Sequence, residues 1–367
     1  MTAAEEHILP LVRPEMLALT PYSSARSEAK GGAGPSPRVW LDANENPETP
    51  SVGAPLHNRY PEPQPADLVA RLAQLYRVAP GNLLVTRGSD EGIDLLLRAF
   101  CRAGRDAILI TPPTYGMYRV AAAIQDARVD TAPLDARKGF ALDAAAVLKA
   151  VTPATKIVFL CSPNNPTGAL LDRGAVLRLA QKLLGRAVVV VDEAYIEFAS
   201  GRGTAGGRSL ATELRRHPNL IVLRTLSKAY GLAGVRCGAT VADPAVIAVL
   251  RKIIAPYPIP GPVLEAALAA LSPGGLAAAK RSVAALVAGR KQLAAALRKL
   301  PAVRRVWPSD ANFLLLAVDD AARVMAAARA RGVVLRDRSR DVPDTVRITA
   351  GAPAENAAVL EVFRSLP

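Results

Sequence analysis

The sequence predicts an α/β fold with a mostly parallel central sheet flanked by helices, and a smaller α+β domain. Apolar runs that end in polar residues recur between residues 82 and 228, as expected for strands covered on both faces. Segments with helical periodicity separate these runs, which is the alternation typical of a parallel sheet. The proline-rich stretch PYPIPGP at 256–262 then interrupts the pattern, so that a second domain is expected after it.

The expected units follow in order along the 367 residues. Residues 1–37 contain five prolines and the glycine-rich link KGGAGPSP, which is typical of an N-terminal arm. The large domain is expected over 38–258 and the small domain over 259–367. Strands of the large sheet are predicted at 82–88, 106–113, 156–163, 187–195 and 219–228. A helix at 276–300, a strand at 312–318, a helix near 320–331 and a strand at 345–351 are predicted for the small domain.

The charge of the chain is strongly positive, with a formal net charge of +14. Such a charge can indicate nucleic acid, an anionic membrane surface or acidic small molecules as partners. The arginines are scattered, no block of five like charges occurs, and aromatic residues do not alternate with the basic ones. We therefore expect a solvated basic surface and no nucleic-acid partner.

Cysteines and apolar runs bear on the compartment and on metals. The three cysteines are far apart and show no CxxC spacing, so neither a disulfide framework nor a metal site is expected. No apolar run approaches the roughly 18 residues of a membrane span, and the first residues do not resemble a signal peptide. A cytoplasmic protein without a membrane partner is the expectation.

Several polar side chains stand where predicted strands end. Ser89 and Asp90 open a predicted helix, with Ser89 as a plausible cap, and the N–H groups of such a helix start favour an anion. An ordinary capped helix explains the same residues. Asn165 lies in a turn, and Asp192 and Tyr195 follow four valines. A carboxylate in that position requires a cationic or donor partner, such as a pyridinium N–H or an arginine.

The stretch TLSKAYGLAGVRCG at 225–238 places Lys228 directly after a predicted strand, with Arg236 eight positions later. Its glycines do not fit GxGxxG, and the acidic residue that would bind a ribose is missing at the usual distance, which argues against a nicotinamide cofactor. The chain also has no GxxxxGK[ST] loop. Because open α/β sheets bind ligands at the carboxyl ends of their strands, Lys228 is a candidate functional residue.

Taken together, the motifs resemble those of fold-type I pyridoxal-phosphate enzymes of the class II aminotransferase group. Within that group they are most similar to the histidinol-phosphate aminotransferase family. The similar segments occur in the family's order and are LDANENP (41–47), NRYPEPQP (58–65), TPPTYGMY (111–118), CSPNNPTG (161–168), VDEAYIEF (191–198), TLSKAYGLAGVRCG (225–238) and LRD…VRITAG (335–351).

The resemblance implies pyridoxal 5'-phosphate as cofactor and assigns roles to individual residues. Lys228 would be the Schiff-base lysine and later the proton carrier. Asp192 would pair with the pyridine nitrogen, while Tyr195 and Asn165 would bind the ring's 3-oxygen and Tyr115 would stack on the ring. The phosphate would be held by Ser89, Asp90, Thr225, Ser227, Arg236 and, from the neighbouring subunit of a homodimer, Tyr60.

The resemblance also implies where substrate binds and what the reaction is. The residues implied for substrate are Tyr22, Asn44, Arg336 and Arg347. The arm and the C-terminal domain, which carry most of these residues, would form the smaller domain, and the arm would also take part in dimer contacts. The substrates would be a phosphorylated amine, L-histidinol phosphate, and a 2-oxo acid, 2-oxoglutarate. An aromatic-amino-acid transaminase, a threonine-phosphate decarboxylase, and a nucleic-acid-binding protein that has kept the fold remain as alternatives.

Overall fold

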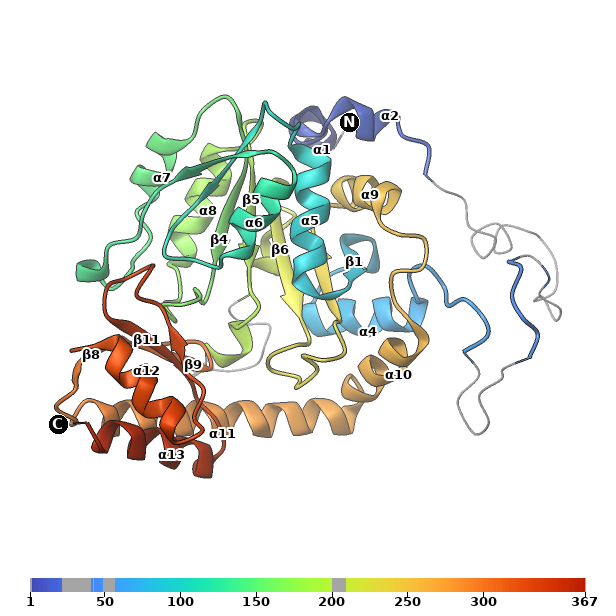
Figure 1. The fold of residues 1–367 in the computed structure, drawn as a ribbon. Coiled ribbons are helices and arrows are strands. Elements are labelled where there is room, and N and C mark those ends of the chain that lie inside the picture. Colours follow the sequence, from blue (N-terminus) through green and yellow to red (C-terminus); the bar gives the residue numbers. More distant parts are fainter. Residues whose placement is uncertain (1, 22–40, 42, 49–56, 200–208, 367) are drawn as a thin grey trace.

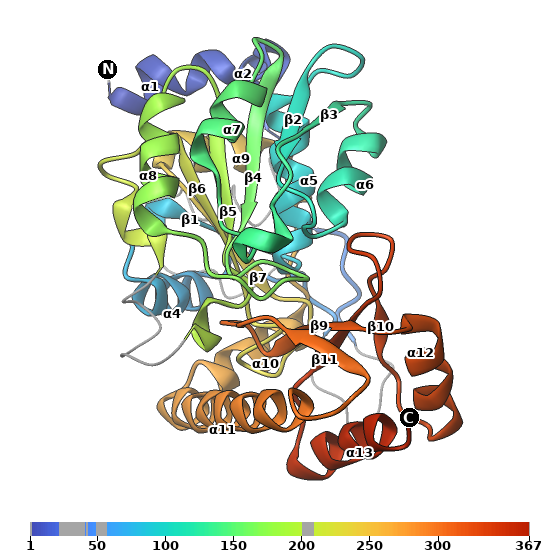
Figure 2. The same cartoon turned by 90° about the vertical axis from the view of Figure 1, so that its left-hand side faces the viewer.

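The structure, a computed structural model, describes residues 2–21, 41, 43–48, 57–199 and 209–366 (Figure 1). A large α/β unit carries a seven-stranded sheet, and a smaller unit with a four-stranded sheet lies below it in Figures 1 and 2. The predicted fold class is confirmed.

The large sheet has the strand order β1-β7-β6-β5-β4-β2-β3. Its strands run parallel except β7, which is antiparallel to both of its neighbours. The strand bounds are β1 Leu83–Thr86, β2 Ala107–Ile110, β3 Arg128–Thr131, β4 Thr155–Cys161, β5 Val188–Asp192, β6 Leu220–Thr225 and β7 Gly238–Val241.

Both faces of this sheet are buried, which explains the continuous apolar runs. Along β5, Val189 and Val191 belong to one core cluster, and Val188 and Val190 to the cluster on the other face. The first cluster includes side chains of α4 (Ala66–Tyr76), α7 (Ala144–Ala150), α8 (Arg173–Lys182) and α10 (Gly261–Ala270). The second includes side chains of α5 (Gly88–Phe100), α6 (Met117–Ile124) and α9 (Pro244–Ile253).

The described part of the expected arm packs on the large unit. It forms α1 (Ala3–His7), a 3-10 turn (Leu9–Leu11) and α2 (Pro14–Ala18). Ala4, Ile8 and Val12 enter the core on the α5 face, and Lys252 Nζ on α9 donates to the Leu17 carbonyl at 2.7 Å. We expected this segment to join the smaller domain. Its apolar side chains find their partners on the large unit instead.

The smaller unit has the sheet order β10-β11-β9-β8, with all neighbours antiparallel. Its strands are β8 Val303–Val306, β9 Phe313–Val318, β10 Arg336–Asp337 and β11 Thr345–Thr349. Helices α12 (Ala321–Ala330) and α13 (Pro353–Arg364) complete its core together with the end of α11 (Pro273–Leu297). Short 3-10 helices elsewhere span Pro80–Asn82, Ala136–Lys138, Ile196–Phe198 and Leu210–Glu213.

Helix α11 connects the two units, running beneath the large one in Figure 1. Its Val287 packs in one cluster with Tyr195 of the large unit and Phe313 of β9. Among the described residues, no single helix has the length and apolar character of a membrane span; α10 and α11 meet the length and composition test only as a pair bent by 71°.

Candidate active site

The strand ends of the large sheet meet at one edge. In the strand registers, Asp192 at the end of β5 lies between Cys161 of β4 and Leu223 of β6. Gly238, the first residue of the antiparallel strand β7, pairs with Thr225 on one side and Thr86 on the other. Because β7 starts where β6 and β1 end, the residues that follow β1, β5 and β6 lie at a common site.

The start of α5 differs from the expectation in one detail. The helix begins at Gly88, so Ser89 lies inside its first turn and is not the cap, a position held by Arg87 without a side-chain cap. Glu91 accepts the Arg87 N–H at 2.7 Å instead. First-turn N–H groups have no acceptor within a helix, so those of Ser89 and Asp90 suit an anion.

Arg236 lies beside this helix start. Its Nη1 donates to Ser227 Oγ at 3.1 Å, and its Nη2 donates to Asp90 Oδ2 at 3.2 Å. Thr225 Oγ1 donates in turn to Ser227 Oγ at 2.9 Å. We call Ser89, Asp90, Ser227 and Arg236 the anion cup. Its backbone, hydroxyl and guanidinium donors fit a phosphate group.

Two glycines make room for the anion cup. A Cβ on Gly88 would stand 2.6 Å from Arg236 Nη2, and the backbone conformation of Gly88, with φ of +77°, is one that L side chains rarely adopt. A Cβ on Gly238 would come within 2.7 Å of the Gly88 carbonyl carbon. The guanidinium therefore occupies space that any other residue at position 88 would fill.

Asp192 is buried, with 2% of its surface exposed. Its Oδ2 accepts a hydrogen bond from the Tyr118 hydroxyl at 2.9 Å, and its Oδ1 accepts one from the Ala194 N–H at 3.1 Å. Burial raises the pKa of Asp192 to about 6, while these two hydrogen bonds oppose the rise. An ionised carboxylate in this position is stabilised by a cation, and a protonated pyridine nitrogen fits that requirement.

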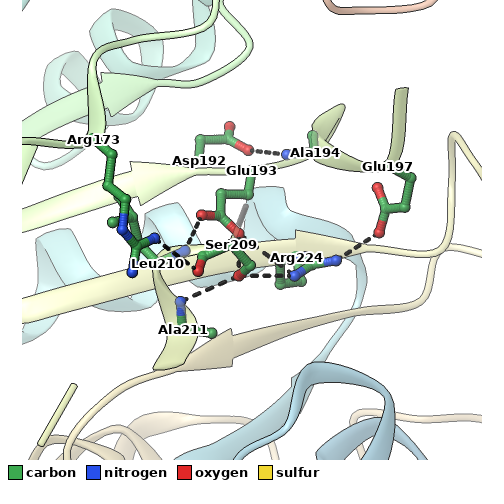
Figure 3. Close-up of polar contacts among 9 residues, drawn as sticks. All are labelled: Arg173, Asp192, Glu193, Ala194, Glu197, Ser209, Leu210, Ala211 and Arg224. Atoms are coloured by element: carbon green, nitrogen blue, oxygen red, sulfur yellow. Dashed lines mark hydrogen bonds and ion pairs between the residues drawn. The ribbon is translucent and has the colours of Figure 1, made fainter. Parts of the chain in front are cut away.

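A buried ionic network holds the segment after β5 (Figure 3). Arg224 of β6, only 1% exposed, donates to Glu197 at 2.6 Å and to Ser209 Oγ at 3.1 Å. Glu193 accepts from the Ser209 hydroxyl at 2.6 Å and from the Leu210 N–H at 2.7 Å. Glu193 lies between Asp192 and Tyr195, and Glu197 follows Tyr195 by two residues. The network therefore holds the backbone from which the side chains of Asp192 and Tyr195 project.

Lys228 has the electrostatic environment of a reactive amine. Partial burial, followed by the positive charges of Arg347 and Arg236, lowers its pKa. Its Nζ lies 5.7 Å from the centroid of the Tyr195 ring. A lysine whose pKa is lowered has a larger fraction of unprotonated amine, which is the nucleophilic form.

The remaining aromatic and amide residues surround the same space. The Tyr115 hydroxyl donates to Asp90 Oδ1 at 3.0 Å, and burial raises the pKa of that hydroxyl. Asn165 Oδ1 accepts from Arg347 Nη1 at 2.5 Å, which links β11 of the smaller unit to the large one. Tyr195 packs edge-on against Phe313 of β9 at 5.2 Å.

Arg336 and Arg347 are directly opposite each other in the antiparallel pair β10–β11. Side chains of directly opposed residues project from the same face of a sheet. Burial lowers the pKa of Arg347, and the charges of Arg338 and Arg336 contribute to the lowering. This face therefore concentrates positive charge beside Asn165, as a site for an anionic substrate requires.

Two predicted residues stand apart from this constellation, and a third falls on a part of the chain that the structure does not describe. Tyr60 stacks on Tyr257 with ring centroids 4.4 Å apart and is 49% exposed. Asn44 is exposed and has a φ of 54°. Tyr22 lies outside the described residues. Within the described part of the chain, no group of three or more His, Cys, Asp or Glu side chains could hold a metal ion.

Comparison with known proteins agrees with this geometry. The family model for aminotransferase class I and II matches residues 27–363. The chain belongs to the class I and II aminotransferases. Enzymes of this family depend on pyridoxal phosphate, and the anion cup, Asp192 and Lys228 supply donors, carboxylate and amine that fit this cofactor.

Individual relatives of this aminotransferase are similar over nearly the whole chain. A histidinol-phosphate aminotransferase of Stenotrophomonas maltophilia (strain R551-3) is 47% identical over 98% of this chain and 97% of its own. The solved structure of histidinol-phosphate aminotransferase from Sinorhizobium meliloti in complex with pyridoxal-5'-phosphate has a TM-score of 0.74 at 26% identity, over 85% of this chain and 84% of that one. L-threonine-O-3-phosphate decarboxylase from Porphyromonas gingivalis has a TM-score of 0.70 at 25% identity, covering 84% of this chain and 90% of that one.

Three residues of the candidate site escaped prediction from the sequence. Gly88 and Gly238 matter through the space that they leave, which depends on the pairing of β1 with β7. Tyr118 lies on α6, which begins at Met117, and its place in the segment TPPTYGMY was the available signal for it. Its partner Asp192 is far away in sequence, so the contact itself could not be foreseen.

Proposed function

We propose that this protein is a pyridoxal-phosphate-dependent transaminase that exchanges an amino group between L-histidinol phosphate and 2-oxoglutarate, in histidine biosynthesis. The products would be 3-(imidazol-4-yl)-2-oxopropyl phosphate and glutamate. The observation that carries the proposal is the combination of Asp192, Lys228 and the anion cup at one sheet edge, facing arginines on a second unit. Relatives named histidinol-phosphate aminotransferase at 43–47% identity support the substrate.

The cofactor, when bound, supplies an aldehyde for the substrate amine and a ring that accepts electrons as Cα loses its proton. The anion cup would hold its phosphate through Ser227, Arg236 and the first-turn N–H groups of α5. Asp192 would keep the pyridine nitrogen protonated. Asn165 and Tyr195 would bind the ring's 3-oxygen, and Tyr115 would stack on the ring.

Lys228 would first bond to the cofactor and then act as general base. Its lowered pKa favours the free amine that both roles need. The Nζ atom would take up and hold the proton that the substrate's Cα loses. The packing of Tyr195 against Phe313 and the Asn165–Arg347 hydrogen bond hold the smaller unit against the large one beside Tyr195, whose ring centroid lies 5.7 Å from this amine.

The substrate's anionic group would bind Arg347 and Arg336, with Asn44 and Tyr22 completing the pocket. Histidinol phosphate brings a phosphate and 2-oxoglutarate brings carboxylates, and guanidinium groups bind either one. By the family resemblance, Tyr60 would contact the cofactor phosphate of a second subunit, and its half-exposed ring in the single chain is compatible with that role. We therefore propose a homodimer with shared active sites. We also propose that the protein is located in the cytoplasm and has no nucleic-acid or membrane partner.

A half-reaction assay tests the proposal. Histidinol phosphate should convert the bound cofactor to pyridoxamine phosphate, with its change in absorption, and 2-oxoglutarate should restore the starting spectrum. Equally rapid conversion by phenylalanine would favour an aromatic-amino-acid transaminase. Release of carbon dioxide from threonine phosphate, without conversion by histidinol phosphate, would favour a decarboxylase and overturn the proposal.

A further inference from the structure

Tyr118 is placed to control Asp192, because its hydroxyl donates a hydrogen bond to that carboxylate. It lies on α6 and is fully buried. Its ring stacks on Phe159 of β4 at 4.7 Å and 9°, and meets Tyr115 edge-on at 5.6 Å. These two contacts fix the ring, so that its hydroxyl reaches Asp192 Oδ2 at 2.9 Å.

The hydrogen bond has a direction with chemical consequences. A phenol O–H that donates to a carboxylate stabilises the ionised carboxylate over the protonated acid. Burial acts on Asp192 in the opposite sense, and Asp90 adds a like charge. Lys228 is the cation that favours ionised Asp192, and Cys161 is a further titratable group near the Tyr118 hydroxyl. Tyr118 is thus the side-chain hydroxyl that offsets the effect of burial.

We propose that Tyr118 is a positioning residue whose hydroxyl holds Asp192 ionised and oriented toward the protonated ring nitrogen of the cofactor. The inference rests on the proposed function in so far as that function supplies the pyridine ring. Tyr118 itself acts through Asp192 and touches no reacting atom. Removing its hydroxyl should therefore weaken the interaction at the ring nitrogen and leave the anion cup unchanged.

The chain offers a matched control for the loss of a buried phenol. Tyr76 on α4 is also buried, with 1% of its surface exposed, and its hydroxyl has no hydrogen-bond partner among the described residues. Its ring lies beneath the Arg224 guanidinium, 4.3 Å from the centroid, and a phenylalanine would keep that contact. Tyr76→Phe and Tyr118→Phe thus remove the same atom, but only the second breaks a hydrogen bond to a carboxylate.

The experiment compares two ligands on the cofactor-free protein. Pyridoxamine phosphate binds without the covalent bond to Lys228, and an analogue with carbon in place of the ring nitrogen lacks the partner of Asp192. Tyr118→Phe should weaken binding of pyridoxamine phosphate about tenfold, as expected for loss of one hydrogen bond to a charged group. It should leave binding of the carbon analogue unchanged, and Tyr76→Phe should change neither.

If Tyr118→Phe weakened binding of both ligands equally, the inference would be overturned. Equal weakening would mean that the substitution distorts the whole site and does not act through the ring nitrogen. Unchanged binding of both ligands would also overturn it. A second measurement uses Asp192→Asn, in which adding Tyr118→Phe should produce no further loss; a full additional loss would contradict an action through Asp192. Failure of the wild-type protein to bind pyridoxamine phosphate at all would instead reject the proposed function.

Discussion

Substitution of Gly88 by alanine tests whether the anion cup depends on the space left by a missing side chain. The new Cβ would stand 2.6 Å from Arg236 Nη2 and 3.2 Å from its Cζ. Nonbonded heavy atoms rest at about 3.5 Å, so the guanidinium would have to move by about 1 Å. Arg236 would then lose its hydrogen bonds to Ser227 and Asp90, which measure 3.1 and 3.2 Å.

Two effects of this substitution can be separated by magnitude. The left-handed backbone at position 88, with φ of +77°, costs about 1–2 kcal/mol for a residue with a side chain. Loss of a charge-assisted hydrogen bond to the phosphate weakens cofactor binding by about 1.5–3 kcal/mol, which raises the dissociation constant about 10- to 100-fold. The first effect lowers stability with or without cofactor, whereas the second appears only in binding.

Gly332→Ala provides the control for strain alone. Gly332 has a φ of +67°, and a Cβ there would meet nothing within 4 Å. Both variants should lower the thermal midpoint of the cofactor-free protein, Gly88→Ala further because Arg236 also loses its hydrogen bonds to Ser227 and Asp90. In a fluorescence titration with pyridoxal phosphate, only Gly88→Ala should lose affinity. Full cofactor affinity in Gly88→Ala would refute the reasoning that the guanidinium needs this space.

Three further predictions concern the charged groups. Arg224→Met leaves Glu193 and Glu197 without their buried cation, and should lower the free energy of unfolding in urea by about 3–5 kcal/mol. Arg364→Met removes one partner of an exposed ion pair, and should change the same free energy by less than about 1 kcal/mol. The pKa of Asp192 is raised to about 6, so its protonated form favours folding. Its contribution is complete below the usual value of 3.8, and is lost as pH rises through 6. Between pH 4 and 7, the free energy of unfolding of the cofactor-free Asp192→Asn protein should therefore rise by up to about 3 kcal/mol relative to that of the wild type. Unfolding free energies that change in parallel with pH in the two proteins would contradict this. Arg347→Leu should raise the KM for 2-oxoglutarate about 10- to 100-fold, whereas steady-state kinetics of Arg340→Leu, which removes an exposed arginine, should match wild type.

Sequence patterns predicted those elements whose environment is uniform. The valine run of β5 is buried on both faces, so its apolar character shows the strand directly. β3, with the sequence RVDT, lies at the sheet edge and is half exposed, and its mixed composition gave no such signal. β7 has only four residues and runs antiparallel in an otherwise parallel sheet. Its position follows from tertiary pairing, which local periodicity does not encode.

The candidate site shows the same division. Asp192 and Lys228 were found because each follows a strand, and the carboxyl edge of a parallel sheet brings such residues together. The resemblance added Arg347, whose contact with Asn165 joins residues 182 positions apart. The packing of Ala3–His7 on the large unit was not foreseen, because a short amphipathic segment fits several apolar surfaces equally well.

The arrangement of charges around Lys228 indicates how the same amine can serve in two steps. In the protein without ligands, partial burial and then the charges of Arg347 and Arg236 lower the pKa of Lys228, which favours the unprotonated amine that can bond to an aldehyde. An anion on Arg347 and a phosphate on Arg236 would neutralise these two charges. The pKa of Lys228 would then rise, and a stronger base would face the Cα proton. An anionic substrate on Arg347 would thus make the amine a better proton acceptor when it is needed for that role, whereas a neutral substrate there would leave the charge of Arg347 in place.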